Sequence, residues 1–216
     1  MFGWSQSPLM DVEQVKHFIF VLMGKSAAGK DTLFQTIMGE TNLPLKTVVP
    51  YTTRPMRENE REGREYHFCT EEELSAMKRQ GRVIECRRYD TVFGPWYYFT
   101  ADDGQIDLRT SSYLVIGTPD SYVSFADYFG PGFIVPLYVA VDDGVRLERA
   151  LQREREQKEP RYSEMCRRFL ADEKDFSPER LESLGITSFY DNSDLRTCAD
   201  AIERDIDGKI RGRENR

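Results

Sequence analysis

The sequence is poor in cysteine and histidine and has no long apolar run. Its two histidines and the absence of any Cys-x-x-Cys spacing argue against a structural zinc site or a disulfide framework. The apolar stretch near the start, residues 18–23, is far shorter than the roughly 20 residues that cross a bilayer, and no signal-peptide pattern is present. We therefore expect a cytoplasmic protein without a membrane partner, whose reduced thiols are Cys69, Cys86, Cys166 and Cys198.

Positive charge is also in deficit. Thirty Lys and Arg stand against 37 Asp and Glu, which gives a formal net charge of -7. A surface that coats a nucleic-acid polymer needs a broad excess of cations, so no such partner is expected, although a local basic pocket is compatible with this charge. The length of 216 residues and the hydrophobic fraction of 39% predict one domain over residues 1–216, as a monomer or a small homo-oligomer.

Short apolar runs alternate with amphipathic stretches along the chain, which is typical of an α/β protein. The apolar runs predict strands at 17–23, 46–49, 113–116 and 133–141. Helical spacing predicts a helix from Lys30 that stops at Gly39, and a final helix over 195–210.

Residues 53–99 differ in character and predict an inserted lobe. Charged loops alternate with short strand candidates at 66–68, 83–86 and 96–99. Thr70 and Glu73 have the spacing of a capping box, so a helix should begin there and end before Gly81.

A second irregular region predicts a mobile flap of two helices. Residues 142–157 and 162–174 each have helical periodicity, and Pro160 interrupts the pattern between them.

A glycine-containing segment between the first strand and the first helix predicts a phosphate-binding loop. Glycines allow the backbone N–H groups to curl around an anion, the helix N-terminus adds partial positive charge, and Lys30 can reach the β- and γ-phosphates of a nucleotide. The residues of this loop are Gly24, Lys25, Ser26, Ala27, Ala28, Gly29, Lys30, Asp31 and Thr32.

The loop departs from the usual pattern at the residue after the lysine, where Ser or Thr normally serves Mg²⁺. Asp31 stands there and Thr32 follows. Two interpretations remain open: Asp31 holds magnesium through water, or Asp31 caps the helix while Thr32 serves the phosphate or the metal.

A second motif lies in residues 50–68, where Thr52-Thr53-Arg54 is followed by Arg57, Glu60, Gly63 and Tyr66-His67-Phe68. This order and spacing resemble the signature of guanylate kinases. The resemblance extends over roughly residues 18–206. It implies a P-loop three-layer α/β/α fold with a mostly parallel sheet, an acceptor-binding lobe at about 53–99 and a helical lid at about 146–175. The core would comprise about 15–52, 100–145 and 176–216.

The resemblance also implies ATP- and Mg²⁺-dependent phosphorylation of a nucleoside monophosphate, most naturally GMP. Arg54 and Arg57 would clamp the acceptor phosphate, a task for which a planar guanidinium is well suited. Glu60 would orient those arginines, Tyr66 would add a hydroxyl, and Glu85 would accept hydrogen bonds from guanine.

The flap carries further residues that the resemblance implicates. Arg153 and Arg168 would stabilise the transferred phosphoryl group, with Arg155 as an alternative in the uncertain register of the first flap helix. Asn192 would lie near the adenine of ATP. Helix surfaces laced with ion pairs are the plainer interpretation of the same arginines.

Several family positions have lost their polar group, and they gather on the acceptor side. They are Pro50, Phe93 and Pro95 in place of hydroxyl residues, and Ile116 and Thr118 in place of an Asp-x-Asp pair. Tyr97 or Tyr98 would have to substitute for the hydroxyl that Phe93 lacks. Asp90, Asp102, Asp103 and Asp120 are possible replacements for the carboxylates. The acceptor could therefore be another phosphorylated small molecule, or the chain could be a binding module with weak catalysis.

Overall fold

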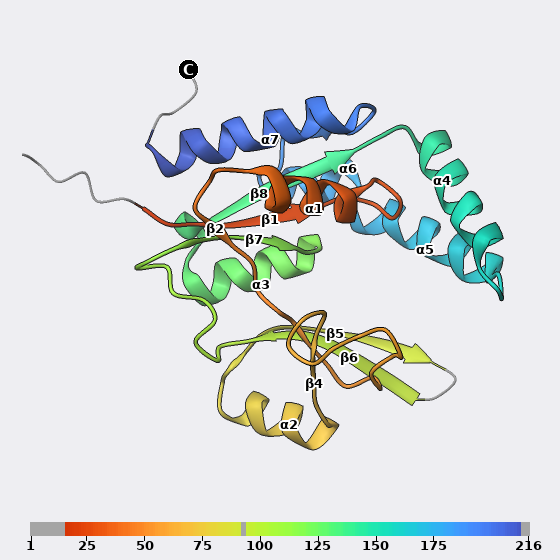
Figure 1. Cartoon of the computed structure of the whole chain (residues 1–216), viewed down its shortest axis with the longest axis horizontal. Helices are drawn as coiled ribbons and strands as arrows, with labels where there is room; N and C mark the ends of the chain where they lie inside the picture. The colour runs from red at the N-terminus through yellow and green to blue at the C-terminus, as the bar shows by residue number, and fades with distance from the viewer. Residues whose placement is uncertain (1–15, 92–93, 213–216) are drawn as a thin grey trace, which may run out of the picture.

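The computed structural model describes residues 16–91 and 94–212, and a five-stranded parallel sheet forms its centre (Figure 1). The strand order is β2-β7-β1-β8-β9. The pairings β1–β7, β1–β8, β2–β7 and β8–β9 are all parallel. The strands are β1 (Ile19–Met23), β2 (Leu45–Lys46), β7 (Ser112–Ile116), β8 (Ile134–Ala140) and β9 (Tyr190–Asp191).

Helices cover both faces of this sheet because the central strand β1 is apolar on both sides. Phe20 and Leu22 pack in one cluster with α1 (Lys30–Glu40) and α7 (Leu195–Ile210). Ile19 and Val21 pack in a second cluster with α3 (Pro119–Phe129) and α6 (Pro178–Ser183). The predicted α/β class with a mostly parallel sheet is confirmed, and the layers are visible in Figure 1.

A smaller sheet lies beside α3 and has the order β4-β3-β6-β5. Its strands are β3 (Tyr51–Thr52), β4 (His67–Phe68), β5 (Val83–Thr91) and β6 (Gly94–Ala101). Helix α2 (Glu71–Arg79) packs on it through Leu74, and the predicted capping box of Thr70 and Glu73 is present. Strands β5 and β6 are longer than predicted because their antiparallel pairing continues to Thr91 and Gly94.

Helices α4 (Asp143–Glu156) and α5 (Tyr162–Asp175) project from the carboxyl end of the large sheet (Figure 1). Both were expected, and Pro160 lies between them as predicted.

The expected stop at Gly39 is wrong, because α1 continues to Glu40 and ends with Thr41 as its C-cap. The strand expected over 46–49 is confined to β2 (Leu45–Lys46). Helices α3 and α6 were not predicted, and both begin with proline after a hydroxyl N-cap.

In the part of the chain that the structure describes, no helix is both long and apolar enough to span a membrane.

Gly24 at the start of the phosphate loop and Gly39 in the last turn of α1 give a matched stability test. A Cβ on Gly24 would lie 2.3 Å from the Val139 carbonyl oxygen, whereas a Cβ on Gly39 would meet nothing within 4 Å. We expect Gly24→Ala to lower the free energy of unfolding by about 2 kcal/mol through overpacking. Gly39→Ala should raise it by about 0.5 kcal/mol, because alanine is the better helix former. Urea unfolding measures both free energies. Equal effects of the two substitutions would show that the close approach of Gly24 to the Val139 carbonyl does not require glycine.

Candidate functional site

The segment Gly24 to Gly29 forms the tight turn that joins β1 to α1. Ala27 and Gly29 both have positive φ, at 61° and 90°, which turns the backbone sharply before the helix. Gly29 is the N-cap of α1 and has no side chain with which to cap the helix. Free N–H groups at a helix start, together with the helix dipole, form an anion-binding arrangement.

Lys30 folds back over this turn. Its ammonium donates to the carbonyl oxygens of Gly24 at 2.6 Å and Lys25 at 3.0 Å. Burial lowers the pKa of Lys30, and the nearby Asp31 carboxylate partly opposes that shift. The cation is therefore held at the mouth of the loop, where an incoming anion would meet it.

Asp31 and Thr32 lie in the exposed first turn of α1. Mg²⁺ is usually held by one or two protein oxygens together with water and substrate phosphates. One carboxylate and one hydroxyl at the head of α1 fit that pattern. No group of three or more His, Cys, Asp or Glu suited to a metal occurs within residues 16–91 and 94–212. Ile116 and Thr118 offer no carboxylate at the end of β7, where the family carries its Asp-x-Asp pair. The Thr118 hydroxyl lies 3.1 Å from the Ser121 hydroxyl.

Asn192 braces the phosphate loop from the end of β9. Its side-chain amide donates to the Ala28 carbonyl oxygen at 2.7 Å, and the residue is 4% exposed. A Cβ on Gly29 would lie 2.4 Å from the same amide nitrogen, so the close approach requires glycine. The Oδ1 atom of Asn192 has no hydrogen-bond partner in the described part of the chain. This buried acceptor is available to a donor group of a ligand.

Arg149, which the sequence did not single out, approaches the same place. Its guanidinium donates to the main-chain oxygen of Asn192 at 3.4 Å. Nothing in the sequence distinguishes Arg149 from the other arginines of its helix, because only the fold places its tip next to the loop.

An ion network that the sequence analysis also missed joins the loop to α4 and α5. The Ser26 N–H donates to Asp172 Oδ2 at 2.7 Å, and the Lys25 ammonium donates to Glu173 at the same distance. Arg146 lies between these groups, 1% exposed, and donates to Glu173 at 3.0 Å. The loop is therefore in direct contact with α5.

The two predicted flap arginines occupy different surroundings. Arg153 on α4 is exposed, and its charge lies close enough to Lys30 to lower the pKa of that lysine. Arg168 on α5 is exposed and donates to Glu164 at 2.9 Å. Arg155 is exposed as well.

A second cluster lies on the small sheet around Arg54, which is only 3% exposed. Glu60 accepts from two guanidinium nitrogens of Arg54, one of them at 2.7 Å, and the Glu60 carboxylate also accepts the Arg57 N–H at 2.9 Å. These bonds lower the pKa of Glu60 to about 2 and raise that of Arg54. The Arg57 side chain is exposed. The fixed guanidinium of Arg54 is thus followed three residues later by the exposed guanidinium of Arg57.

Aromatic side chains hold Arg54 from its other sides. The Tyr66 ring centre is 5.0 Å from the guanidinium carbon, and burial raises the pKa of the Tyr66 hydroxyl. The Tyr98 hydroxyl accepts from Arg54 Nε at 3.2 Å. Tyr97 instead lies under the Lys78 ammonium, so Tyr98 is the tyrosine that shares this cluster. Phe93 lies outside the described residues.

Glu85 forms the buried end of the same sheet face and is 5% exposed. Its carboxylate accepts from the Thr100 hydroxyl at 3.0 Å, from Arg87 Nε at 3.2 Å and from the Ser121 hydroxyl at 3.5 Å. Ser121 belongs to the first turn of α3. Shortly before this turn, the Gly117 N–H donates to the Leu22 carbonyl oxygen of β1. Glu85 therefore lies near the carboxyl edge of the large sheet, from which the phosphate loop also emerges.

The four aspartates considered as replacements for the missing pair are engaged locally. Asp103 accepts from the Tyr51 hydroxyl at 2.6 Å and Asp102 from the Tyr128 hydroxyl at 2.8 Å. Asp90 is paired with Arg88, and Asp120 with Arg180. Pro95 pairs with Asp90 in the β5–β6 ladder, and the Pro50 carbonyl accepts the His67 N–H.

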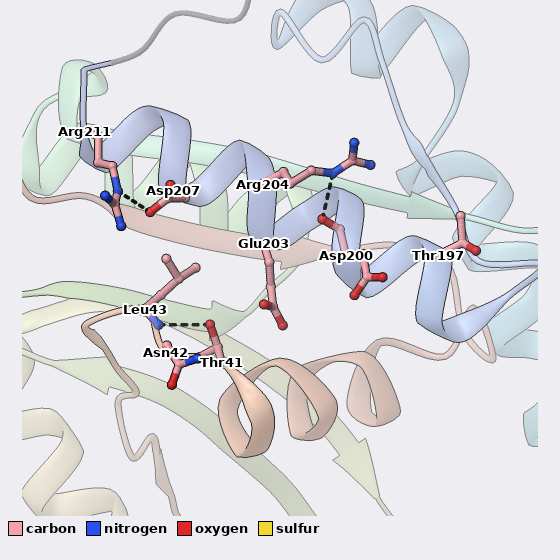
Figure 2. Close-up of a pocket in the computed structure, with 9 residues that line it drawn as sticks. All are labelled: Thr41, Asn42, Leu43, Thr197, Asp200, Glu203, Arg204, Asp207 and Arg211. Atoms are coloured by element: carbon pink, nitrogen blue, oxygen red, sulfur yellow. Dashed lines mark hydrogen bonds and ion pairs between the residues drawn. The ribbon is translucent and has the colours of Figure 1, made fainter.

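Two cavities differ in their relation to these clusters. One of about 310 Å³ adjoins the phosphate loop and is lined by Lys25, Tyr138, Asp143 and Arg146, among others. Another of about 690 Å³ lies between the segment after α1 and the outer side of α7 (Figure 2). Several of its charged side chains bond within or next to α7, as Arg211 does to Asp207, while the Glu203 carboxylate points into the space (Figure 2).

Comparison with known proteins adds three findings. Residues 16–97 match the model of the guanylate kinase family. The chain is 38% identical over 98 residues to a guanylate kinase of Neisseria gonorrhoeae and 28% identical over 98 residues to one of Rhodopirellula baltica. These alignments cover 45% of this chain in both cases, and 45% and 46% of the two relatives. The chain thus aligns with less than half the length of these curated relatives.

The structural likeness extends further than the sequence match. A crystal structure of guanylate kinase from Anaplasma phagocytophilum superposes with a TM-score of 0.58 at 19% identity, and covers 91% of this chain and 87% of that one. The family match over residues 16–97 includes the phosphate loop, Arg54 with Glu60 and Tyr66, and Glu85. Helices α4 and α5 and Asn192 lie beyond it and are related through the fold alone.

The geometry around Lys30 leads to a prediction about its protonation. Because burial disfavours the charged ammonium, Lys30 should titrate below 10.5, the ordinary lysine value. Asp31→Asn should lower the pKa of Lys30 further, since it removes a neighbouring negative charge. Competitive amine labelling between pH 8 and pH 11, with Lys30 resolved by peptide mass spectrometry, measures both. A Lys30 midpoint that rises in Asp31→Asn would contradict this electrostatic account.

Proposed function

We propose that this chain is a member of the guanylate kinase family and that it transfers the γ-phosphoryl group of ATP to a nucleoside monophosphate, with GMP as the acceptor. The observation that carries the proposal is the pairing of two cationic sites. One is the phosphate loop with Lys30 at its mouth. The other is the buried Arg54, fixed by Glu60 on the neighbouring sheet. A nucleotide kinase needs one site for each phosphate-bearing substrate.

The donor would bind at the carboxyl edge of the parallel sheet. The N–H groups of residues 24–32 would hold its phosphates, and Lys30 would leave the Gly24 and Lys25 carbonyls to bind the β- and γ-phosphates. Asn192, which braces the loop and keeps a buried oxygen without a partner in the described residues, would accept from the amino group of adenine. Arg149 at the same place would contact the adenosine part.

The acceptor phosphate would bind at the Arg54 cluster. Arg54 is already oriented by Glu60, so little conformational freedom is lost when it grips a phosphate. The exposed Arg57 would close on the phosphate as a second guanidinium, and Tyr66 and Tyr98 would add hydroxyl groups.

The acceptor base would lie against Glu85 and Arg87. Guanine has a carbonyl acceptor beside an N–H donor, and this pair offers a guanidinium donor beside a carboxylate acceptor. Adenine presents an amino group where guanine has the carbonyl, so the pair favours guanine. The Thr100 and Ser121 hydroxyls can rotate when the carboxylate accepts from the base.

In the reaction, an oxygen of the acceptor phosphate attacks the γ-phosphorus in line. A new O–P bond forms, the bond from the γ-phosphorus to the bridging oxygen breaks, and ADP leaves with that electron pair. Lys30 and the exposed Arg153 would offset the charge of the migrating group, and Arg168 would approach as α4 and α5 close and exclude water.

Asp31 and Thr32 are the residues that would hold Mg²⁺ at the head of α1. When bound, the ion neutralises phosphate charge and orients the donor. A cytoplasmic setting, where ATP and nucleoside monophosphates are both available, belongs to the same proposal.

The experiment is a coupled assay of ADP formation with GMP, dGMP, AMP, CMP and UMP. We expect turnover with GMP and dGMP, and kcat/KM for AMP lower by roughly tenfold or more, from the mismatch at Glu85 and Arg87. Lys30→Ala should reduce kcat by orders of magnitude with little change in Tm, because Lys30 acts on the phosphates. Turnover with a different acceptor alone would replace GMP in the proposal, and no turnover with any acceptor would refute it.

Glu60→Gln tests how the acceptor phosphate is held. A neutral amide cannot fix Arg54 through two charge-assisted bonds, so KM for the acceptor should rise roughly tenfold while KM for ATP changes little. Glu58→Gln is the matched control, because Glu58 is exposed in the same loop. Initial rates over a matrix of both substrates separate the two constants. Equal effects of the two substitutions would show that Glu60 does not orient Arg54.

A further inference from the structure

A carboxylate of α5 occupies part of the phosphate loop. The Ser26 N–H, one of the groups that would face the donor phosphates, donates at 2.7 Å to Asp172 Oδ2. Backbone N–H groups of such loops bind anionic oxygens, and a carboxylate oxygen meets the same requirement as a phosphate oxygen. Asp172 thus stands where a phosphate oxygen could bind.

More cationic groups surround Asp172 than one carboxylate needs, as a site for a phosphate would require. Arg146 Nη1 lies 3.5 Å from Asp172 and 3.3 Å from the Ser26 carbonyl oxygen, while Lys25 is paired with Glu173. The charge of Asp172 also reaches Lys30, whose pKa it raises. The cavity of about 310 Å³ that Lys25 and Arg146 line adjoins this point.

Arg146 does not depend on Asp172 for its burial. Its guanidinium also bonds Asp143 at 2.9 Å and Glu173 at 3.0 Å, and it stacks 4.6 Å from the centre of the Phe169 ring. A buried cation is costly only when it is left unpaired. Asp143 lies on α4 with Arg146, so Arg146 would keep one paired carboxylate if α5 withdrew with Asp172 and Glu173, and its remaining N–H groups would be free for another anion.

The donor cannot share the loop with Asp172. A phosphate oxygen at the Ser26 N–H would lie against the carboxylate, and two anions in one small site repel each other strongly. Either the nucleotide stays out or Asp172 moves away with α5.

We propose that Asp172 is a competitor of the donor phosphates built into α5, and that Arg146 becomes a phosphate-binding residue when Asp172 withdraws. This inference rests on the donor half of the proposed function. The Ser26–Asp172 contact lowers the apparent affinity for nucleotide, because only molecules in which this contact is open can bind the donor. Helix α5 therefore rests on the empty loop and is released when the donor enters.

The test measures the Kd of ATP and ADP by titration calorimetry on the full chain without acceptor. Asp172→Asn keeps the side-chain shape but removes the charge, and should tighten nucleotide binding roughly tenfold, as expected for the loss of a competing charge-assisted hydrogen bond. Asp172→Ala should tighten it at least as much. Arg146→Met should weaken nucleotide binding, even in the Asp172→Asn background.

The matched control is Glu164→Gln, which removes a carboxylate from the same helix that pairs with Arg167 and Arg168 instead of the loop. It should leave both Kd values within twofold of the parent. Unchanged or weaker binding in both Asp172 variants would overturn the inference. If neither the parent nor any variant binds ATP, the donor site itself is refuted. If all bind ATP but none turns over GMP, only the acceptor half of the proposed function fails.

Discussion

The close seating of the phosphate loop on the ends of β8 and β9 is the constraint on which the rest of the site depends. Gly24 leaves no room for a side chain against the Val139 carbonyl, and Gly29 leaves none against Asn192. These two contacts fix the direction in which α1 begins, and with it the position of Lys30. Asn192, just after β9, lies beside the loop because its amide donates to the Ala28 carbonyl, and Arg149 on α4 lies there because it donates to the main-chain oxygen of Asn192. Backbone contact, more than charge, sets the geometry of this region.

Charge is distributed around that frame in local pairs. The net charge is negative, yet three cations of the site each have a carboxylate that orients them: Glu60 for Arg54, Glu173 for Lys25, and Asp143 for Arg146. Paired in this way, buried guanidinium groups are tolerated and held in one orientation. An acidic protein can thus present small cationic pockets without a basic surface.

The sequence predicted those parts of the fold and candidate site that depend on local pattern. Alternation of apolar runs with amphipathic stretches predicted the α/β class, and the Thr70–Glu73 spacing predicted the start of α2. Gly39 was misjudged because a glycine in an exposed last turn need not end a helix. Helix α3 was missed although Thr118 and Pro119 mark its start, since its apolar face is short.

Arg146 and Asp172 could not have been found in the same way. They are 26 residues apart and meet only because α4 and α5 pack against each other beside the loop. In sequence each resembles its many charged neighbours. Long-range pairing of this kind depends on tertiary packing, which a single sequence does not reveal.

Strand β5 belongs to two hydrophobic cores at once. Ile84 is buried in the cluster of the large sheet, whereas Val83 and Cys86 pack against the cluster of the small sheet. The strand is therefore anchored at its Glu85 end and extends away from the anchor toward Thr91. If the small sheet turns relative to the large one, Ile84 is the natural pivot. Groups near it, such as Glu85, would sweep a short arc, and the Arg54 cluster farther along the sheet would sweep a longer one. Such a pivot would keep one end of a bound molecule almost stationary while the other end moved with the small sheet.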